Sequence, residues 1–96
     1  MEPEPELELG PVLAALADPN RRRVVRELAA DPDDGERDCV SFGLPVSKAT
    51  RGHHFKVLRE VGLIRHIDHG NHRTAQLRRA DIDARFPGLL AMLRRE

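Results

Sequence analysis

Residues 47–79 restrict the possible folds more than any other part of the chain. Ser47 is suited to the N-terminal cap of a helix, and Gly62 suits its C-terminal end. Between them, Phe55 and Leu58 follow helical spacing and form an edge expected to be buried. Strand-like alternation begins directly afterwards, so the pattern predicts a helix followed closely by strands.

Two short strands are expected at residues 63–69 and 72–77, joined at Gly70-Asn71. Glycine in the first turn position fits a two-residue type II′ hairpin. The resulting register pairs opposite charges and apolar side chains across the strands: Asp68 with Arg73, and Ile64 with Leu77. A β-hairpin that directly follows a helix is therefore predicted.

The remaining regular segments are predicted to be helical. Pro11 suits the first position of an apolar helix at residues 12–17, and Asp18-Pro19 supplies an N-cap and first residue for a helix running to about residue 30. Asp81 is expected to cap a last segment, which Pro87-Gly88 interrupts before a strongly apolar terminal helix.

Residues 39–46 alternate like a strand, but Gly43 and Pro45 argue against a long regular one. An extended segment and a short turn of helix both remain open here. The order of elements predicts a mainly α fold with a small β-hairpin, in the arrangement of a winged helix-turn-helix. One such domain, residues 9–96, is expected to follow an acidic, Pro/Glu-rich tail at residues 1–8 that is predicted to be disordered.

The net charge of zero conceals a strong division along the chain. Residues 1–46 carry 5 basic and 11 acidic side chains, whereas residues 47–79 carry 8 basic and 2 acidic ones together with all five histidines. Such asymmetry indicates a localised binding surface, and the basic part coincides with the predicted helix and hairpin. The plainer interpretation is that solvated helices have segregated charge by accident.

Several classes of protein are excluded or disfavoured. A chain of 96 residues is too short for a two-domain enzyme, and no Gly-rich loop or paired carboxylate is present, so neither catalysis nor a cofactor is expected. No apolar stretch approaches the roughly 18 residues of a membrane span, and no signal peptide is visible. The single cysteine, Cys39, fits a reducing compartment, so we expect a cytoplasmic protein without a membrane segment.

Two segments resemble motifs of ArsR-type bacterial repressors. Residues 16–25, LADPNRRRVV, resemble the family's "LADPTRLRIL" signature. Residues 47–64, SKATRGHHFKVLREVGLI, resemble its "SxSTxSxHLxxLxxAGLV" recognition helix and the exit into the wing. The resemblance spans about residues 11–79 and implies a dimeric, sequence-specific repressor that binds double-stranded operator DNA. Such a repressor is released by an effector, whose identity stays unknown.

The resemblance also implies that the first and last helices, residues 11–17 and 88–95, form the dimer interface. The terminal helix carries more apolar surface than a small monomer can easily cover, which favours the same contact. The residues expected in this homodimer interface are Val12, Leu13, Leu16, Leu89, Leu90 and Leu93.

The chain departs from the family pattern in three places. Where many metal sensors of the family carry paired cysteines, only Cys39 stands. The last helical region has Asp81 and Asp83 but no histidine, so the metal ligands found there in other members are missing. Gly43 and Pro45 leave little room for the first helix of the helix-turn-helix. Three alternatives then remain open: the effector is a small molecule, it is a thiol oxidant that acts on Cys39, or the protein has no effector.

The predicted DNA contacts lie on the basic helix and hairpin. The N-terminal half of a recognition helix reads base edges in the major groove, and cations near it neutralise phosphates or reach guanine. The residues expected to contact DNA are Lys48, Thr50, Arg51, His53 and Lys56 on the helix, with Asn71 and Arg73 on the wing.

Some residues allow two interpretations. Gly52 would permit close approach to DNA or relieve crowding inside the fold. His54 is expected to be half-buried and structural rather than a DNA contact. The arginines at 21–23 are expected to form structural ion pairs, with phosphate contact as the second interpretation.

Two competing functions remain beside DNA binding. A winged helix can serve as a protein–protein interaction module without binding DNA. His66, His69 and His72 have regular spacing, but a hairpin turn would bring only His69 and His72 together, and a closed zinc site usually takes four ligands. No metal site is therefore predicted.

Overall fold

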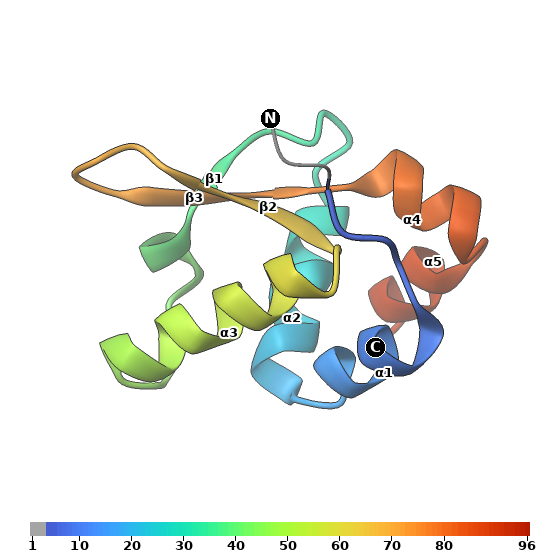
Figure 1. The fold of residues 1–96 in the computed structure, drawn as a ribbon, viewed down its shortest axis with the longest axis horizontal. Coiled ribbons are helices and arrows are strands. Elements are labelled where there is room, and N and C mark those ends of the chain that lie inside the picture. The colour runs from blue at the N-terminus through green and yellow to red at the C-terminus, as the bar shows by residue number, and fades with distance from the viewer. Residues whose placement is uncertain (1–3) are drawn as a thin grey trace.

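The computed structural model describes residues 4–96 (Figure 1). The helices are α1 (Leu9–Leu16), α2 (Pro19–Ala29), α3 (Lys48–Glu60), α4 (Arg79–Arg85) and α5 (Leu89–Arg94), with one turn of 3-10 helix, η1 (Cys39–Phe42). The strands are β1 (Arg37–Asp38), β2 (Ile64–Asp68) and β3 (Arg73–Leu77). The predicted mainly α fold with a small hairpin is confirmed.

The sheet lies along one side of the helices, with α1, α2 and α3 beneath it in Figure 1. Its strand order is β1-β3-β2, with both pairs antiparallel. The predicted hairpin register is confirmed, because Ile64 pairs with Leu77 and Asp68 with Arg73. β1 was not predicted from the sequence: it lies in the polar connection after α2 and adds two residues to the outer edge of β3.

Two predicted helix caps are present. The Asp18 carboxylate accepts hydrogen bonds from the backbone N–H groups of Asn20 and Arg21, and the Ser47 hydroxyl accepts one from the N–H of Thr50. These bonds satisfy donors that a helix N-terminus leaves without intrahelical partners.

Two predicted helix starts need correction. α1 begins at Leu9, so Pro11 is its third residue rather than its first. α4 begins at Arg79, and Asp81 lies inside its first turn, where it contacts the Arg78 guanidinium instead of capping the helix. Acidic groups are stabilised anywhere in the first turn of a helix, so the sequence signal marked the region but not the residue.

The undecided segment 39–46 forms a short helical turn. η1 covers Cys39–Phe42, and Gly43 ends it with a φ of 61°, in the left-handed region that favours glycine. The strand-like alternation in the sequence does not correspond to a strand. Of the alternating apolar residues, Phe42 and Leu44 are buried whereas Val40 is exposed. The first helix of the helix-turn-helix is reduced to one turn.

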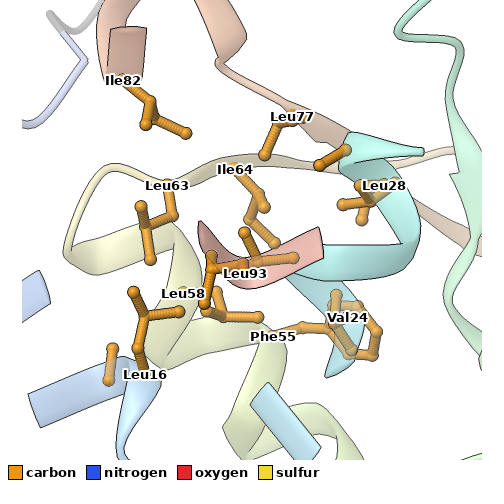
Figure 2. Packing of buried hydrophobic residues seen from close by; sticks show 14 of the residues in the cluster. Leu16, Val24, Leu28, Phe55, Leu58, Leu63, Ile64, Leu77, Ile82 and Leu93 are labelled. Carbon is orange, nitrogen blue, oxygen red and sulfur yellow. The ribbon is translucent and has the colours of Figure 1, made fainter. Parts of the chain in front are cut away.

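The core lies between the sheet and the helices (Figure 2). Phe55 and Leu58 of α3 pack there against Val24 and Leu28 of α2 and against Ile64 of β2. All five are at most 3% exposed. The helical edge predicted from Phe55 and Leu58 is therefore the face that anchors α3, which leaves its other face free.

The segment before α1 makes contacts with the rest of the domain. Residues 1–3 lie outside the described residues. From Glu4 on, the segment predicted to be disordered contacts the domain: Leu7 is 8% exposed, and the Pro5 carbonyl accepts a hydrogen bond from Arg78 at 2.9 Å. Glu4 adds ion pairs with Arg65 at 3.0 Å and with Arg78 at 2.6 Å, so several contacts hold this segment against the domain.

Most of the predicted dimer-interface residues lie inside the subunit. Val12, Leu16, Leu90 and Leu93 belong to the hydrophobic core and are at most 6% exposed. They are buried because α1 and α5 both pack their apolar sides onto the rest of the domain. Leu89 is half-buried and Leu13 is 53% exposed, so only these two of the six predicted residues remain accessible.

Candidate nucleic-acid interface

The basic helix and the hairpin form one edge of the molecule. The N-terminal half of α3, the turn η1 and the tip of the hairpin all lie at the left of Figure 1, away from α1, α4 and α5. The hairpin, residues 64–77, is called the wing from here on. Among the predicted contact residues, Arg51 is half-buried and the other six are exposed: Lys48, Thr50, His53, Lys56, Asn71 and Arg73.

A groove with a volume of about 880 Å³ runs between α3 and the wing. It is lined by residues 38–41 in and before η1, by Lys48, Arg51, Gly52 and Phe55 of α3, and by residues 66, 68 and 70–73 of the wing. Four predicted DNA contacts, Lys48, Arg51, Asn71 and Arg73, therefore border one groove. Thr50, His53 and Lys56 are exposed on α3 outside it.

The cations beside this groove are largely free of acidic partners. Within residues 4–96, neither Lys48 nor Arg51 has a carboxylate within 4.0 Å. Lys56 and Arg73 have only loose, exposed partners, at 4.0 Å from Glu60 and 3.8 Å from Asp68. Exposed pairs of this kind contribute little stability, so these charges can turn to another partner at small cost.

Gly52 lies on the exposed side of α3 in open space. A Cβ built at this position meets no atom within 4 Å. Crowding inside the fold therefore does not require glycine here, which removes one of the two interpretations offered by the sequence.

Two arginines hold the shortened first helix of the helix-turn-helix. Arg23 of α2 donates to the Phe42 carbonyl at 2.7 Å, and Arg37 of β1 lies with its guanidinium 4.0 Å from the Phe42 ring centroid. Both also contact the Glu27 carboxylate. Burial raises the pKa of Glu27, but hydrogen bonds from the two arginines outweigh it and hold the pKa below its usual value. The ring of Phe42 packs on the ring of Phe55 in α3, with 5.6 Å between the ring centroids. The contacts of Arg23 and Arg37 with Phe42 therefore also support the recognition helix.

His54 attaches α3 to the start of α2. It is 5% exposed, and its Nδ1 lies 3.5 Å from an Arg21 guanidinium nitrogen while Nε2 lies 3.9 Å from Asp18. Because an arginine can only donate, this contact is a hydrogen bond only when Nδ1 carries no proton, which is the neutral form of the ring. Burial lowers the pKa of His54 in the same direction, and the nearby Arg21 charge adds to this. The structural role expected for His54 fits this burial.

The wing is tied to the loop before β1 through Glu36. The Thr74 hydroxyl donates to the Glu36 carboxylate at 2.6 Å, and His69 Nε2 lies 2.9 Å from the same oxygen. These two hydrogen bonds hold the pKa of Glu36 below its usual value. His69 also stacks on His72, with ring centroids 4.6 Å apart. The wing tip is thus held by polar contacts rather than by the core.

The three spaced histidines do not converge. His66 stacks on Phe55 at 5.8 Å between the ring centroids, whereas His69 and His72 meet at the wing tip. Among residues 4–96, no group of three or more histidine, cysteine or acidic side chains is placed to hold a metal ion.

Cys39 is 6% exposed on the floor of the groove, and burial raises the pKa of its thiol to about 11. The thiol is therefore protonated near neutral pH, whereas the nucleophilic form is the thiolate. This environment disfavours the idea that an oxidant acting on Cys39 is the effector.

Sequence reasoning missed Val40 and Glu36. Val40 is 61% exposed at the edge of the groove, and its place was hidden because residues 39–46 could not be assigned to one element. Glu36 lay in a polar connection with no sign that it would reach Thr74, 38 residues away. Neither position carries a local signal that could have identified it.

Similar folds are found among solved structures of transcriptional regulators, although no similar curated sequence was found. No protein-family model and no curated sequence matches the chain. Two solved structures are similar. The first is an ArsR-like transcriptional regulator from Rhodococcus sp. RHA1, with a TM-score of 0.62, 24% sequence identity, and coverage of 86% of this chain and 76% of that one. The second is a "possible transcriptional regulator for arsenical resistance", with a TM-score of 0.60, 29% identity, and coverage of 84% and 90%.

The helix, its braced partner turn and the wing define a winged helix-turn-helix. More particularly, the chain has the fold of ArsR-like transcriptional regulators, and the resemblance indicated by its two sequence motifs is confirmed by these neighbours. Both neighbours are described as transcriptional regulators, the second as a possible one. Within residues 4–96, no helix has the length and apolar character needed to cross a lipid bilayer.

Proposed function

We propose that this protein is a dimeric repressor that binds a specific double-stranded DNA operator. The observation that carries the proposal is the edge formed by α3 and the wing, where Lys48 and Arg51 have no carboxylate within 4.0 Å among residues 4–96 and Lys56 and Arg73 have only loose ones. DNA presents one negative charge per roughly 1.7 Å of helix axis, and an α-helix fits its major groove. As an operator-binding protein it would act in the cytoplasm, and its effector stays open.

The proposed division of labour follows from exposure. Lys48, Arg51 and Lys56 neutralise phosphates or reach guanine, while Thr50 and His53 face the base edges. The Thr50 hydroxyl accepts a hydrogen bond from Ser47 at 3.0 Å, which leaves its own O–H available to donate to DNA. Asn71 and Arg73 on the wing contact the flanking backbone.

The proposed dimer contact is formed by apolar side chains that remain exposed on α1 and α5. Leu9 and Leu13 stand one helical turn apart on α1, at 55% and 53% exposed, and Met92 of α5 is 60% exposed. Half-buried Leu89 completes this set, which we call the terminal patch. A symmetric dimer that covers the terminal patch leaves both wings and both recognition helices free to bind two half-sites.

The function is tested by selecting bound sequences from a random DNA pool and then measuring affinity at several salt concentrations. If the dimer makes about 8 phosphate contacts, a plot of the logarithm of the association constant against the logarithm of the salt concentration falls with a slope near −7. Selected sequences should contain two related half-sites. A flat salt response with no enriched sequence would contradict DNA binding and favour a winged helix that serves only protein–protein contact.

The dimer contact is tested separately with Leu13→Asp, which places a charge in the terminal patch. Sedimentation should show a dimer for the natural chain and a monomer for the variant. Val40→Asp is the matched control, since Val40 is similarly exposed but lies beside the groove. If Leu13→Asp stays dimeric, the terminal patch is not the interface.

A further inference from the structure

We infer that the groove between α3 and the wing is also a binding site for a small organic anion with an apolar body. Such a ligand would occupy the space that DNA must approach and would therefore act as a direct competitor. The binding site stands on the groove itself, whereas its effect on DNA rests on the function proposed above.

The groove has the size and floor of a small-molecule site. Its volume of about 880 Å³ lies within the roughly 300–1,000 Å³ typical of ligand pockets. Phe55 and Cys39 form an apolar floor that reaches the core, and His66 stacks on Phe55 beside them. Gly52 adds no side chain to the wall, and Val40 supplies an exposed apolar rim.

The charge of the groove selects an anion. Lys48 and Arg51 have no carboxylate within 4.0 Å among residues 4–96. Arg51 of α3 and Arg73 of β3 both line the groove, so guanidinium groups reach it from the recognition helix and from the wing.

The two acidic residues of the groove are already engaged. The Asp38 carboxylate accepts from the N–H of Val40 at 2.9 Å, and the Asp68 carboxylate accepts from the N–H of Gly70 at 2.8 Å. Asp68 has only a long contact with Arg73, at 3.8 Å. These hydrogen bonds orient the two carboxylates but leave their charge in place, so the lining carries three cations, Lys48, Arg51 and Arg73, against two carboxylates, a net charge of +1 with the histidines neutral.

The apolar floor is the feature that DNA alone does not explain. A phosphodiester backbone needs only cations, whereas exposed Val40 and half-buried His66 gain when carbon displaces water from them. Phe55 and Cys39, at 1% and 6% exposed, lie behind this apolar surface and are already shielded from water. The occupant that satisfies both parts is an aromatic or branched carboxylate or sulfonate. Its charge would lie between Arg51 and Arg73, with its carbon body on the floor.

The site is tested without DNA, using 8-anilinonaphthalene-1-sulfonate as the probe and following its fluorescence. N-phenyl-1-naphthylamine, the same ring system without the sulfonate, and inorganic phosphate are the two comparison ligands. Because the probe contains both required parts, it should bind at least 10-fold more tightly than either of them. Equal binding of the neutral ring system would overturn the selection of an anion.

Four variants locate the bound probe. Gly52→Leu fills the groove from a helical position with open space around it, and Arg73→Gln removes a guanidinium from the exposed wing. Each should weaken probe binding at least 10-fold. Arg94→Gln on α5 and Leu13→Gln in the terminal patch are controls that should change it less than 2-fold. Circular dichroism and thermal unfolding establish that each variant is folded.

The outcomes separate the groove from other surfaces. Loss of binding in Leu13→Gln, with Gly52→Leu and Arg73→Gln unaffected, would place the probe on the terminal patch and overturn the inference. If Gly52→Leu proves unfolded, Arg73→Gln decides the question by itself.

Competition is measured afterwards by titrating selected operator DNA into the protein–probe complex. Displacement of the probe supports the competitive mechanism. If DNA binds but the probe does not, only the groove inference fails, and if the probe binds but no DNA does, only the proposed function fails. Simultaneous binding of both would contradict competition.

Discussion

Arginine is used in two different ways in this molecule. In α2, all four arginines have protein partners: Arg21 bonds the Ala15 carbonyl, Arg22 and Arg26 contact Glu96, and Arg23 contacts Glu27. At the groove, Arg51 has no such carboxylate within residues 4–96, and Arg73 has only a loose one. The run at 21–23 was expected to form structural ion pairs: Arg22 and Arg23 do so, whereas Arg21 is held by carbonyls and has no carboxylate within 4.0 Å among residues 4–96.

The difference shows that a cluster of basic residues is not by itself a binding surface. An arginine that is already bonded to a carbonyl or carboxylate would have to break those bonds before it could contact a ligand. An arginine without a partner gives up only water and counterions. Both α2 and the groove are rich in positive charge in the sequence, but of these two regions within residues 4–96, only α2 has arginines bonded to carbonyls or close carboxylates.

The largest effect is expected when the free cations are removed. Lys48→Gln combined with Arg51→Gln should weaken operator binding roughly 100-fold and lower the salt slope, provided each subunit loses two phosphate contacts. The matched control is Arg22→Gln with Arg26→Gln, which removes the same charge from the paired region. Affinity is measured by fluorescence anisotropy, and equal losses in the two double variants would erase the distinction between the regions.

The next effect is expected in a fully paired arginine. Arg78 is 8% exposed and donates to the carbonyls of Pro5 and Gly62, at 2.9 and 2.7 Å. Arg78→Met leaves both carbonyls without this donor and should lower the free energy of unfolding by about 2 kcal/mol. Urea unfolding gives the value, and operator affinity of the folded variant should stay within about 3-fold.

A smaller, stabilising effect is expected at Gly52. Because a Cβ there meets no atom, Gly52→Ala should raise the free energy of unfolding by about 0.5–1 kcal/mol. Thermal unfolding measures the gain. A loss of operator affinity in this more stable variant would show that a partner approaches the backbone closely, whereas a loss of stability would contradict the open space around Gly52.

The smallest effect concerns pH. Burial lowers the pKa of His54 and of His66 below the ordinary value of 6.5, so protonation is harder in the folded than in the unfolded chain. Their contribution to stability is complete above pH 6.5 and is lost as the pH falls through the folded pKa values.

Unfolding in urea at about pH 7.5 and about pH 5.5 checks this prediction, since the two values bracket the ordinary histidine pKa. The natural chain should be less stable at the lower pH. His54→Gln should reduce the difference while His66 still contributes. An increase in stability on acidification would reverse the inferred sign.

The recognition helix and the wing were predictable because their signals are local. The Ser47 cap and the spacing of Phe55 and Leu58 define one helix, and Gly70 next to alternating residues defines a hairpin register. Each signal operates within a few residues of the backbone that it shapes.

The missed features depend on contacts between distant residues. β1 exists only because β3 offers an edge, with Arg37 paired to Ala75. Leu7 is buried only because the domain supplies a surface for it. The dimer prediction placed Val12 and Leu90 at an interface, since an apolar helix face looks the same in sequence whether it packs inside its own subunit or against a copy.

The sequence by itself determined the winged helix-turn-helix, the side on which positive charge accumulates, and four of the residues that line the groove: Lys48, Arg51, Asn71 and Arg73. Only the tertiary structure decided which cations are free, which leucines remain exposed, and that Phe55 and Cys39 line the same groove as Arg51. Element type and charge position follow from short-range backbone preferences and residue identity. Pairing, burial and groove depth depend on where segments meet in space, which no single segment encodes.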